Sequence, residues 1–306
     1  KSVLSIAGGT FSSDPSAYIA EGSSSMPQQD GTFVVAKAAV AKIGETVYSS
    51  LQEAFDAAEN GQTVVLTSDV AVNGGDNAVR YSGGRSFTVD FASHSVTANT
   101  SNAAFVVVGG AGAESSVTFK NGTITAGPNA YCTVITGKGS NGEAATVNLE
   151  EMTLYNSRVW AVSVKAFAGS SINLTNSSVN SSNGAGGTEA AGGEVNITGC
   201  TFNQGGYYDH NSVNVAASNG GVANVYSGTF TAASFGAYIY NSGGTINIKD
   251  GSFDAGKAVL KADNSTTANP SVINVSAGDF TGAYAVGDKS VLSIAGGTFS
   301  SDPSAY

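Results

Sequence analysis

A short pattern of apolar and polar residues recurs along most of the chain, at intervals of 19 to 30 residues. Each copy reads apolar, polar, apolar, then a small or polar turn, then another apolar residue. The copies are VDFASHSV (89–96), VTFKNGTI (117–124), VNLEEMTL (147–154), INLTNSSV (172–179), VNITGCTF (195–202), ANVYSGTF (223–230), INIKDGSF (246–253), INVSAGDF (273–280) and LSIAGGTF (292–299). Alternation with period two places the first and third residues inward and the middle one outward. The spacing predicts one copy per coil of a β-solenoid.

The outward position of this pattern is polar in every copy. It is occupied by Asp90, Thr118, Asn148, Asn173, Asn196, Asn224, Asn247, Asn274 and Ser293. In stacked coils these residues form a column on the surface, and we expect like side chains to lie above one another.

A second alternating segment lies between most copies, at 105–108, 132–135, 162–164, 213–215, 238–240, 259–260 and 284–286. Two or three strands per coil are what a parallel β-helix requires. The stretch NSSNGAGGTEAAGGE between Val179 and Val195 offers almost nothing apolar. We therefore expect this stretch to be a loop that bulges from the stack.

An amphipathic helix is predicted at Ser50–Glu59, with an apolar face that includes Phe55. Ser50 and Glu53 have the spacing of a capping box, and Asn60-Gly61 supplies the end. A strand at 63–66 follows directly. A helix in this place is expected to cover the open end of the solenoid and protect the first coil from edge-to-edge association.

The first 18 residues, KSVLSIAGGTFSSDPSAY, recur identically at 289–306. The offset of 288 residues predicts an internal segment of a longer tandem array. Residues 1–13 are then the last coil of a preceding repeat, 14–46 a connector, and 47–306 a β-helix unit whose end overlaps the next repeat. The predicted junction residues are Phe11, Asp14, Pro15, Tyr18, Phe299 and Tyr306.

Two parts of the sequence resemble known protein families. YSSLQEAFDAAENGQTVVL (48–66) resembles the capping helix and first strand of pectate-lyase-like β-helix proteins. GGTFSSDPSAYIAEG (8–22) and DGTFVV (30–35) resemble segments that join β-helical repeats in large surface proteins of gut bacteria. The resemblance implies an all-β, right-handed, single-stranded parallel β-helix with a short N-terminal capping helix, located outside a bacterial cell.

Composition supports an all-β fold and narrows the possible partners. Only 12% of residues are charged and 40 are glycine, which favours strands and turns over helices. The net charge of −10, with no cluster of Lys or Arg, argues against binding to nucleic acid or to anionic membranes. No apolar run approaches the roughly 18 residues of a membrane-spanning helix. Cys132 and Cys200 have no metal-binding spacing, and we expect buried free thiols.

No catalytic constellation stands out, and we predict no cofactor and no metal site. A polysaccharide lyase needs clustered carboxylates and a basic residue, and a hydrolase needs two or three acids facing one cleft. The carboxylates of this chain are scattered.

The best candidate for ligand binding is Tyr207, Tyr208, Asp209 and His210, which follow two glycines. An aromatic pair can stack on a sugar ring, and a neighbouring carboxylate and imidazole can form hydrogen bonds with the hydroxyl groups of the sugar. The alternative is a packed loop corner. Arg158 and Trp160, near Tyr155, form a second aromatic and cationic group, for which packing is again the alternative.

Two functions follow as hypotheses. The first is a structural or adhesive module of an extracellular bacterial fibre or filament, with neighbouring copies of the repeat joined head to tail. The second is a carbohydrate-binding or polysaccharide-degrading domain that acts on glycans, including those of cell surfaces; this second hypothesis rests on fold analogy.

Overall fold

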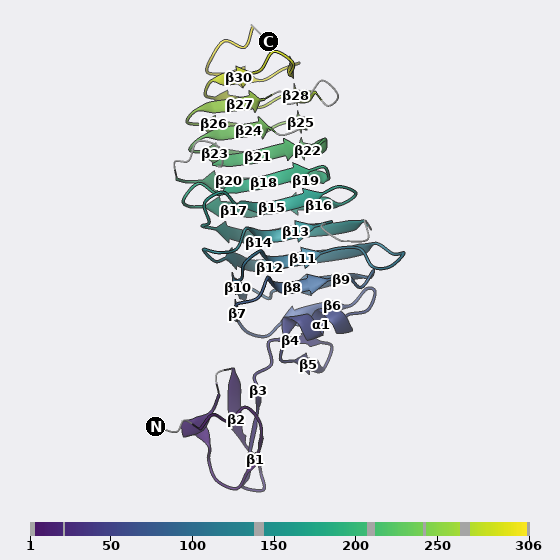
Figure 1. Ribbon diagram of the computed structural model, residues 1–306, viewed down its shortest axis with the longest axis vertical. Helices are drawn as coiled ribbons and strands as arrows, with labels where there is room; N and C mark the ends of the chain where they lie inside the picture. The colour runs from purple at the N-terminus through teal and green to yellow at the C-terminus, as the bar shows by residue number, and fades with distance from the viewer. Residues whose placement is uncertain are drawn as a thin grey trace.

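The chain winds into a parallel β-solenoid of about eight turns, shown with its axis vertical in Figure 1. The computed structural model describes residues 4–20, 22–137, 144–206, 212–240, 243–263 and 270–304. Strands account for 58% of the structure and helices for 4%. The predicted all-β solenoid is therefore confirmed.

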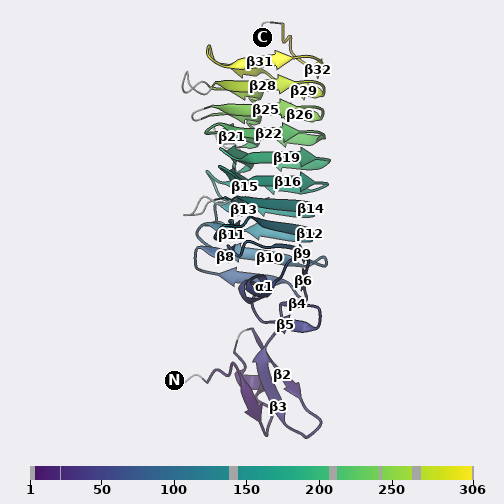
Figure 2. The same ribbon diagram turned by 90° about the vertical axis from the view of Figure 1, so that its right-hand side faces the viewer.

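Three ladders of parallel strands run along the axis, and the edge-on view in Figure 2 shows the stacked coils. The first ladder contains β6 (Thr63–Leu66), β9 (Ser86–Asp90), β12 (Ser115–Ala126), β14 (Ala145–Asn156), β16 (Ser171–Thr175), β19 (Glu194–Thr198), β22 (Gly221–Val225), β25 (Gly244–Ile248), β28 (Ser271–Val275) and β31 (Val291–Ile294). The second contains β7 (Val70–Asn73), β10 (Ser95–Asn99), the ends of β12 and β14, β17 (Ser178–Ser181), β20 (Cys200–Gln204), β23 (Gly228–Ala232), β26 (Ser252–Ala255), β29 (Asp279–Thr281) and β32 (Thr298–Phe299).

The third ladder is a separate sheet that completes each coil. It contains β8 (Asn77–Tyr81), β11 (Ala103–Val107), β13 (Cys132–Thr136), β15 (Val162–Phe167), β18 (Gly186–Ala191), β21 (Val213–Ser218), β24 (Phe235–Ile239), β27 (Ala258–Ala262) and β30 (Tyr284–Val286). Each predicted second segment overlaps one of these strands, and two of them, 105–108 and 238–240, extend one residue beyond the strand's end.

The repeat pattern sets the register between coils. Each final apolar residue pairs with the next one along, as in Val96 with Ile124 and Phe202 with Phe230. One prediction is wrong: the residue in register with Thr118 is Thr88, whereas Asp90 pairs with Lys120. The turn that follows Asp90 is two residues longer than the corresponding turn of the next coil. Matching the final apolar residues, Val96 and Ile124, therefore shifts the positions before the turn by two residues.

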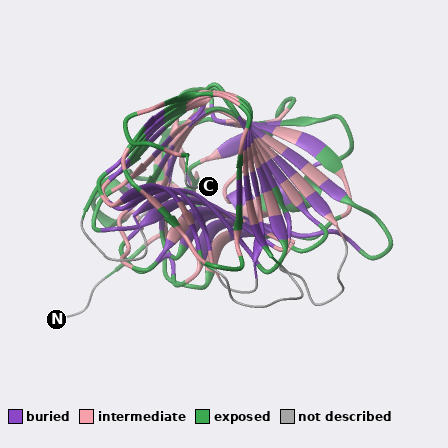
Figure 3. Cartoon of the chain, turned by 90° about the horizontal axis from the view of Figure 1, so that it is seen from above, coloured by how far each residue is buried: buried purple, intermediate pink, exposed green. Residues whose placement is uncertain are grey.

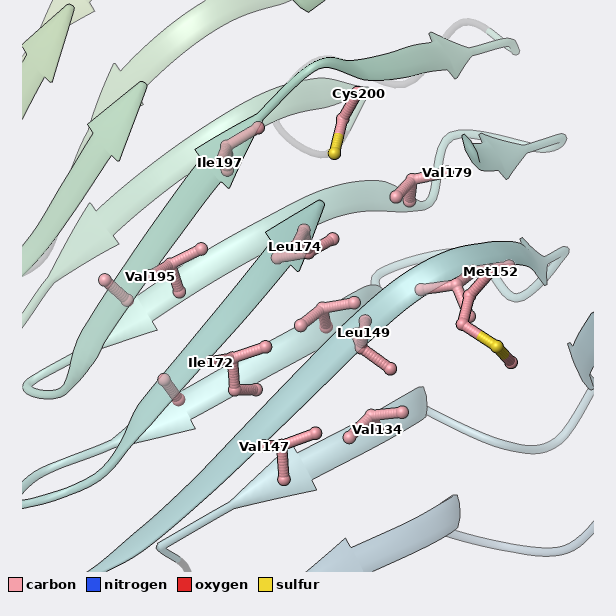
Figure 4. Packing of buried hydrophobic residues seen from close by; sticks show 14 of the residues in the cluster. Val134, Val147, Leu149, Met152, Ile172, Leu174, Val179, Val195, Ile197 and Cys200 are labelled. Atoms are coloured by element: carbon pink, nitrogen blue, oxygen red, sulfur yellow. The ribbon is translucent and has the colours of Figure 1, made fainter. Parts of the chain in front are cut away.

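Buried residues alternate with more exposed ones along the strands, as the burial colours in the view down the axis show (Figure 3), and the close view in Figure 4 shows apolar side chains pointing into the interior. Inward residues such as Val147, Leu149 and Ile172 are buried on successive coils. Toward the C-terminus five phenylalanines stack along the axis. Their ring centroids are 5.0 Å apart for Phe202–Phe230, 4.2 Å for Phe230–Phe253, 5.4 Å for Phe253–Phe280 and 5.0 Å for Phe280–Phe299. The predicted internal ladder is confirmed.

The outward column forms a ladder of hydrogen-bonded asparagine side chains. The Nδ2 of each asparagine donates to the Oδ1 of the asparagine one coil earlier: Asn173 to Asn148 (2.8 Å), Asn196 to Asn173 (2.9 Å), Asn224 to Asn196 (2.9 Å), Asn247 to Asn224 (2.8 Å) and Asn274 to Asn247 (2.9 Å). Each asparagine between two others pairs one amide N–H and its carbonyl oxygen within the column, which explains why like residues stack.

The stretch expected to bulge as a loop is instead a buried strand, β18. It pairs with β15 on one side and β21 on the other. Its inward side chains are small because Phe202, from the second ladder, occupies the space beside Gly187. The expectation of a loop is wrong because the large apolar side chain that fills this part of the core comes from another strand and not from β18 itself.

A short helix, α1 (Leu51–Ala57), covers the first coil, as predicted. Ser50 is its N-cap, and the Ser50 side-chain oxygen accepts a hydrogen bond from the Glu53 N–H. Phe55 is fully buried and packs against the rings of Tyr81 and Phe87. At the other end of the helix, the Arg85 guanidinium donates to the Ala58 carbonyl (2.8 Å).

A small antiparallel sheet precedes the solenoid and lies beyond the capped end (Figure 1). Its strands are β1 (Gly9–Phe11), β2 (Ser23–Pro27) and β3 (Phe33–Lys37), with β3 in the middle; the 3-10 turn η1 (Ser16–Tyr18) links β1 to β2. The next two strands, β4 (Ala41–Ile43) and β5 (Thr46–Tyr48), form a hairpin, and β4 also pairs antiparallel with β6. This hairpin connects the small sheet to the first coil.

Candidate functional site

The duplicated segment lies at both ends of the long axis, with one copy in the small sheet and the other in the last coil (Figure 1). The two copies share two local features. The glycine before the Thr-Phe pair has φ +124° at Gly9 and +125° at Gly297, values that L side chains rarely adopt. Asp14 accepts a bond from the Ser16 N–H (3.0 Å), and Asp302 accepts the matching bond from Ser304 (2.9 Å). The glycine conformation and the Asp–Ser turn are therefore kept in two different surroundings.

The predicted junction residues of the first copy lie in one compact turn. Phe11 is half-buried opposite Phe33, Pro15 is buried, and Tyr18 is exposed. The Ser16 hydroxyl and N–H hold the pKa of the Asp14 carboxyl below its usual range. At the opposite end, Phe299 stacks on Phe280. Tyr306 lies outside the described residues.

A groove of about 460 Å³ lies on the outside of the third ladder, over β13, β15 and β18. Asn156, at the end of β14, positions its rim by donating to the Tyr131 carbonyl (2.9 Å) and accepting from the Arg158 N–H (3.0 Å). The Arg158 guanidinium stacks on the Tyr131 ring, 3.4 Å from its centroid. Trp160 also lines the groove, with 60% of its surface exposed and φ +64°. Bulky residues rarely adopt a positive φ. The surrounding structure must therefore hold the backbone of Trp160 in this conformation.

A buried carboxylate forms part of the floor of the groove. Glu189 is 3% exposed, pairs with Lys165 (2.7 Å) and accepts from the Ser218 hydroxyl (2.6 Å). Burial raises the pKa of Tyr240 well above its usual range, and the charge of Glu189 and a hydrogen bond to it add to the shift. The groove therefore combines an exposed aromatic rim with a charged, hydrogen-bonded floor.

The two groups of candidate ligand-binding residues differ in what the structure describes of them. Tyr207, Tyr208, Asp209 and His210 lie outside the described residues, so the hypothesis about them stays a prediction. Trp160 lines the groove, and Arg158 is connected to it by stacking on the ring of Tyr131, whereas Tyr155 does not line it.

Sequence reasoning missed Tyr131, Lys165 and Glu189 as parts of the groove. Lys165 and Glu189 are in register on adjacent coils. Recognising β18 as a strand would have placed them together.

Within the described ranges, no three His, Cys, Asp or Glu side chains are grouped closely enough to hold a metal ion. Cys132 and Cys200 are buried free thiols, as expected, and burial raises the pKa of Cys200. In the part of the chain that the structure describes, no helix has the length and apolar character needed to span a membrane.

No protein-family model, curated protein or solved structure matches this chain. The solenoid fold agrees with a β-helix, and the resemblance to particular β-helix families stays an expectation from the sequence.

Proposed function

We propose that the chain is a structural repeat module of an extended extracellular fibre, in which successive units join head to tail with a period of 288 residues. The observation that carries this proposal is the duplicated segment. Identical residues, which share the glycine conformation and the Asp–Ser turn, stand at opposite ends of the long axis. A repeat that begins and ends in this way adds length each time it is copied.

The core is suited to a load-bearing role. Apolar residues are buried continuously from the helix-covered end to the last coil, and each coil's backbone bonds run to its neighbours along the axis. Because every coil contacts the coils next to it, stability accumulates along the stack. The proposed place of action is the surface of a bacterial cell, as the resemblance to surface-protein repeats implies.

Electron microscopy of chains with one, two and three units tests the proposal. At about 4.8 Å per coil, each added unit contributes on the order of 40 Å of solenoid, in addition to its small sheet. We expect rods whose length grows by a constant step, with the 306-residue chain as the single-unit reference. Compact particles in which the units fold back on each other would reject the fibre role.

The groove at Tyr131 and Trp160 supports a second candidate function, glycan binding. An exposed indole above a floor of hydrogen-bonding groups matches the apolar face and hydroxyl edge of a sugar. Binding to a glycan array, lost in Trp160→Ala and retained in Tyr155→Ala, is the expected result. Tyr155 is a suitable control because it is an exposed aromatic residue away from the groove. The absence of binding across a broad array would remove this candidate.

A further inference from the structure

We propose that the two ends of the chain are two halves of one junction. In the array, the strand Thr298–Phe299 of one unit lies between two partners: β29 of its own unit, in parallel, and β3 of the next unit, antiparallel. This proposal rests on the tandem array proposed above and specifies how its units make contact.

Each strand of the junction has two edges: we call the edge toward the preceding coil the backward edge and the edge toward the next unit the forward edge. The C-terminal copy shows which backbone groups use the backward edge. The Thr298 N–H donates to the Gly278 carbonyl (2.8 Å) and the Ser300 N–H to the Phe280 carbonyl (2.9 Å). Backbone groups of successive strand residues point to opposite sides. Gly297 and Phe299 therefore present their backbone groups to the other edge, where no strand pairs with β32 within the described residues.

The N-terminal copy shows the forward edge of the same strand. In β1, Gly9 pairs with Val35 and Phe11 with Phe33. The even-numbered residues that flank β3 form hydrogen bonds with the β2 side of the sheet. The Ala38 N–H donates to the Gly22 carbonyl, and the Thr32 carbonyl accepts from the Gln28 N–H. By alternation, residues 33 and 35 bond toward β1, and their partners are Phe11 and Gly9.

Gly9 and Phe11 are the equivalents of Gly297 and Phe299. The two copies therefore use opposite edges of one strand, and their hydrogen bonds do not compete. Among the described residues, β1 is an edge strand with no partner on its backward side, where β29 of a preceding unit would lie.

The strand before the Gly-Gly pair, β31 in the C-terminal copy, also divides its backbone hydrogen bonds between its backward and forward edges. In the C-terminal copy, the Ala295 N–H donates backward to the Val275 carbonyl (2.8 Å), so the backbone groups of Ile294 point forward. In the N-terminal copy, the equivalent Ile6 uses those groups: its N–H donates to the Tyr18 carbonyl (2.8 Å), and its carbonyl accepts from Ala20 (2.8 Å). Residues 18–20 thus begin the next coil on the forward side.

Side-chain burial agrees with this arrangement. Leu292 is 8% exposed against the preceding coil, whereas its equivalent Leu4 is 60% exposed. A preceding unit would cover Leu4 in the same way. A phenylalanine also lies on each side of this position in register, because Phe299 stacks on Phe280 and its equivalent Phe11 is the cross-strand partner of Phe33.

A cysteine pair in a two-unit chain tests the contact. The chain is residues 1–306 followed directly by residues 19–306, so that β3 of the second unit has no β1 of its own. Thr298→Cys in the first unit is combined with Val34→Cys in the second. Thr10 and Val34 form the non-hydrogen-bonded pair of the known contact, and Cα atoms in such pairs are about 4.5 Å apart, within disulfide reach.

Two matched chains calibrate the result. Thr10→Cys with Val34→Cys in the single unit is the positive reference. Thr298→Cys with Ser24→Cys of the second unit is the negative control, because Ser24 lies on β2, beyond β3. Cys132 and Cys200 are buried, and the two-unit chain without added cysteines sets the background.

We expect the Thr298–Val34 pair to cross-link to at least half the extent of the reference, and the control pair to stay at background. Hydrogen exchange of the unsubstituted chains provides a second measurement that needs no variant. Peptides over residues 284–304 contain the C-terminal copy of the duplicated segment and are distinct from the N-terminal copy. In the two-unit chain these peptides come from the junction and from the far end, so about half of the population should exchange at least tenfold more slowly than in the single unit.

Background cross-linking together with unchanged exchange would overturn the junction. If the same chain still forms rods, the fibre role stands and only this contact is wrong. If the chain forms compact particles, both proposals fail.

Discussion

Gly187 shows at the scale of single residues how a strand can form with almost no apolar side chains. A β-carbon at this position would lie 2.5 Å from the Asn214 carbonyl oxygen and 2.7 Å from Cδ1 of Phe202. The phenylalanine ring therefore fills the space that a side chain of β18 would otherwise take. The glycine is required here by close packing, because its φ is not in the left-handed region.

Gly187→Ala should lower the free energy of unfolding by about 1–3 kcal/mol, the range for overpacking a tight core. The change is measured by urea denaturation followed by circular dichroism. Gly8→Ala is the control, because its β-carbon would meet only the Val35 carbonyl oxygen, at 3.7 Å, and should change stability by less than about 0.5 kcal/mol. Equal effects of the two substitutions would show that the contact with Phe202 is unimportant.

Some single residues could be predicted from the sequence and others could not. Phe202 and Phe230 were assigned correctly because period-two alternation fixes the inward face of a strand. Thr88 was missed because the turn after it is two residues longer than in the next coil. Glu189 was missed because its partner, Lys165, is close only when the coils are stacked. The groove thus depends on contacts between coils, which the local pattern does not encode.

At the scale of elements, the asparagine ladder joins strands of the first ladder on their outer face. Asn196 donates to Asn173 and accepts from Asn224. Asn196→Ala should lower the free energy of unfolding by about 1 kcal/mol, because both neighbours lose a partner but remain half-exposed to water. Asn203→Ala is the matched control: Asn203 donates one longer bond, to Asn180 (3.2 Å), and we expect less than about 0.5 kcal/mol. A smaller loss at Asn196 than at Asn203 in chemical denaturation would contradict a stabilising role for the ladder.

Elements with a strong periodic signal were predicted well. The helix was expected at Ser50–Glu59 and lies at Leu51–Ala57, and Ser50 caps it as the capping-box spacing implied. The strand β18 was lost because its burial comes from its neighbours. Its six residues are all buried, yet four of them are Gly or Ala. Apolar pattern therefore predicts the strands that supply the core and misses a strand that only lines it.

At the scale of the whole molecule, the two ends of the solenoid differ. The helix α1 covers the first coil, whereas among the described residues the last coil pairs with a neighbour on one side only. In a stack stabilised by neighbouring coils, the cost of losing a side chain should depend on its position along the axis. Phe253→Ala removes a ring between two stacked neighbours and should cost about 3–5 kcal/mol.

Phe299→Ala removes a half-buried ring with one neighbour in the stack, Phe280, and in the 306-residue chain it should cost less than about 2 kcal/mol. In the two-unit chain the same residue lies inside the proposed junction. The substitution in the first unit should then approach the cost of Phe253→Ala, because β3 of the next unit covers the other side of the strand and brings Phe33 opposite Phe299 as a cross-strand partner. Thermal and urea unfolding of both chains, with Phe253→Ala as the internal standard, measures the difference. An equally small cost in both chains would mean that the last coil stays uncovered, and that units of the array are joined by the connecting chain alone.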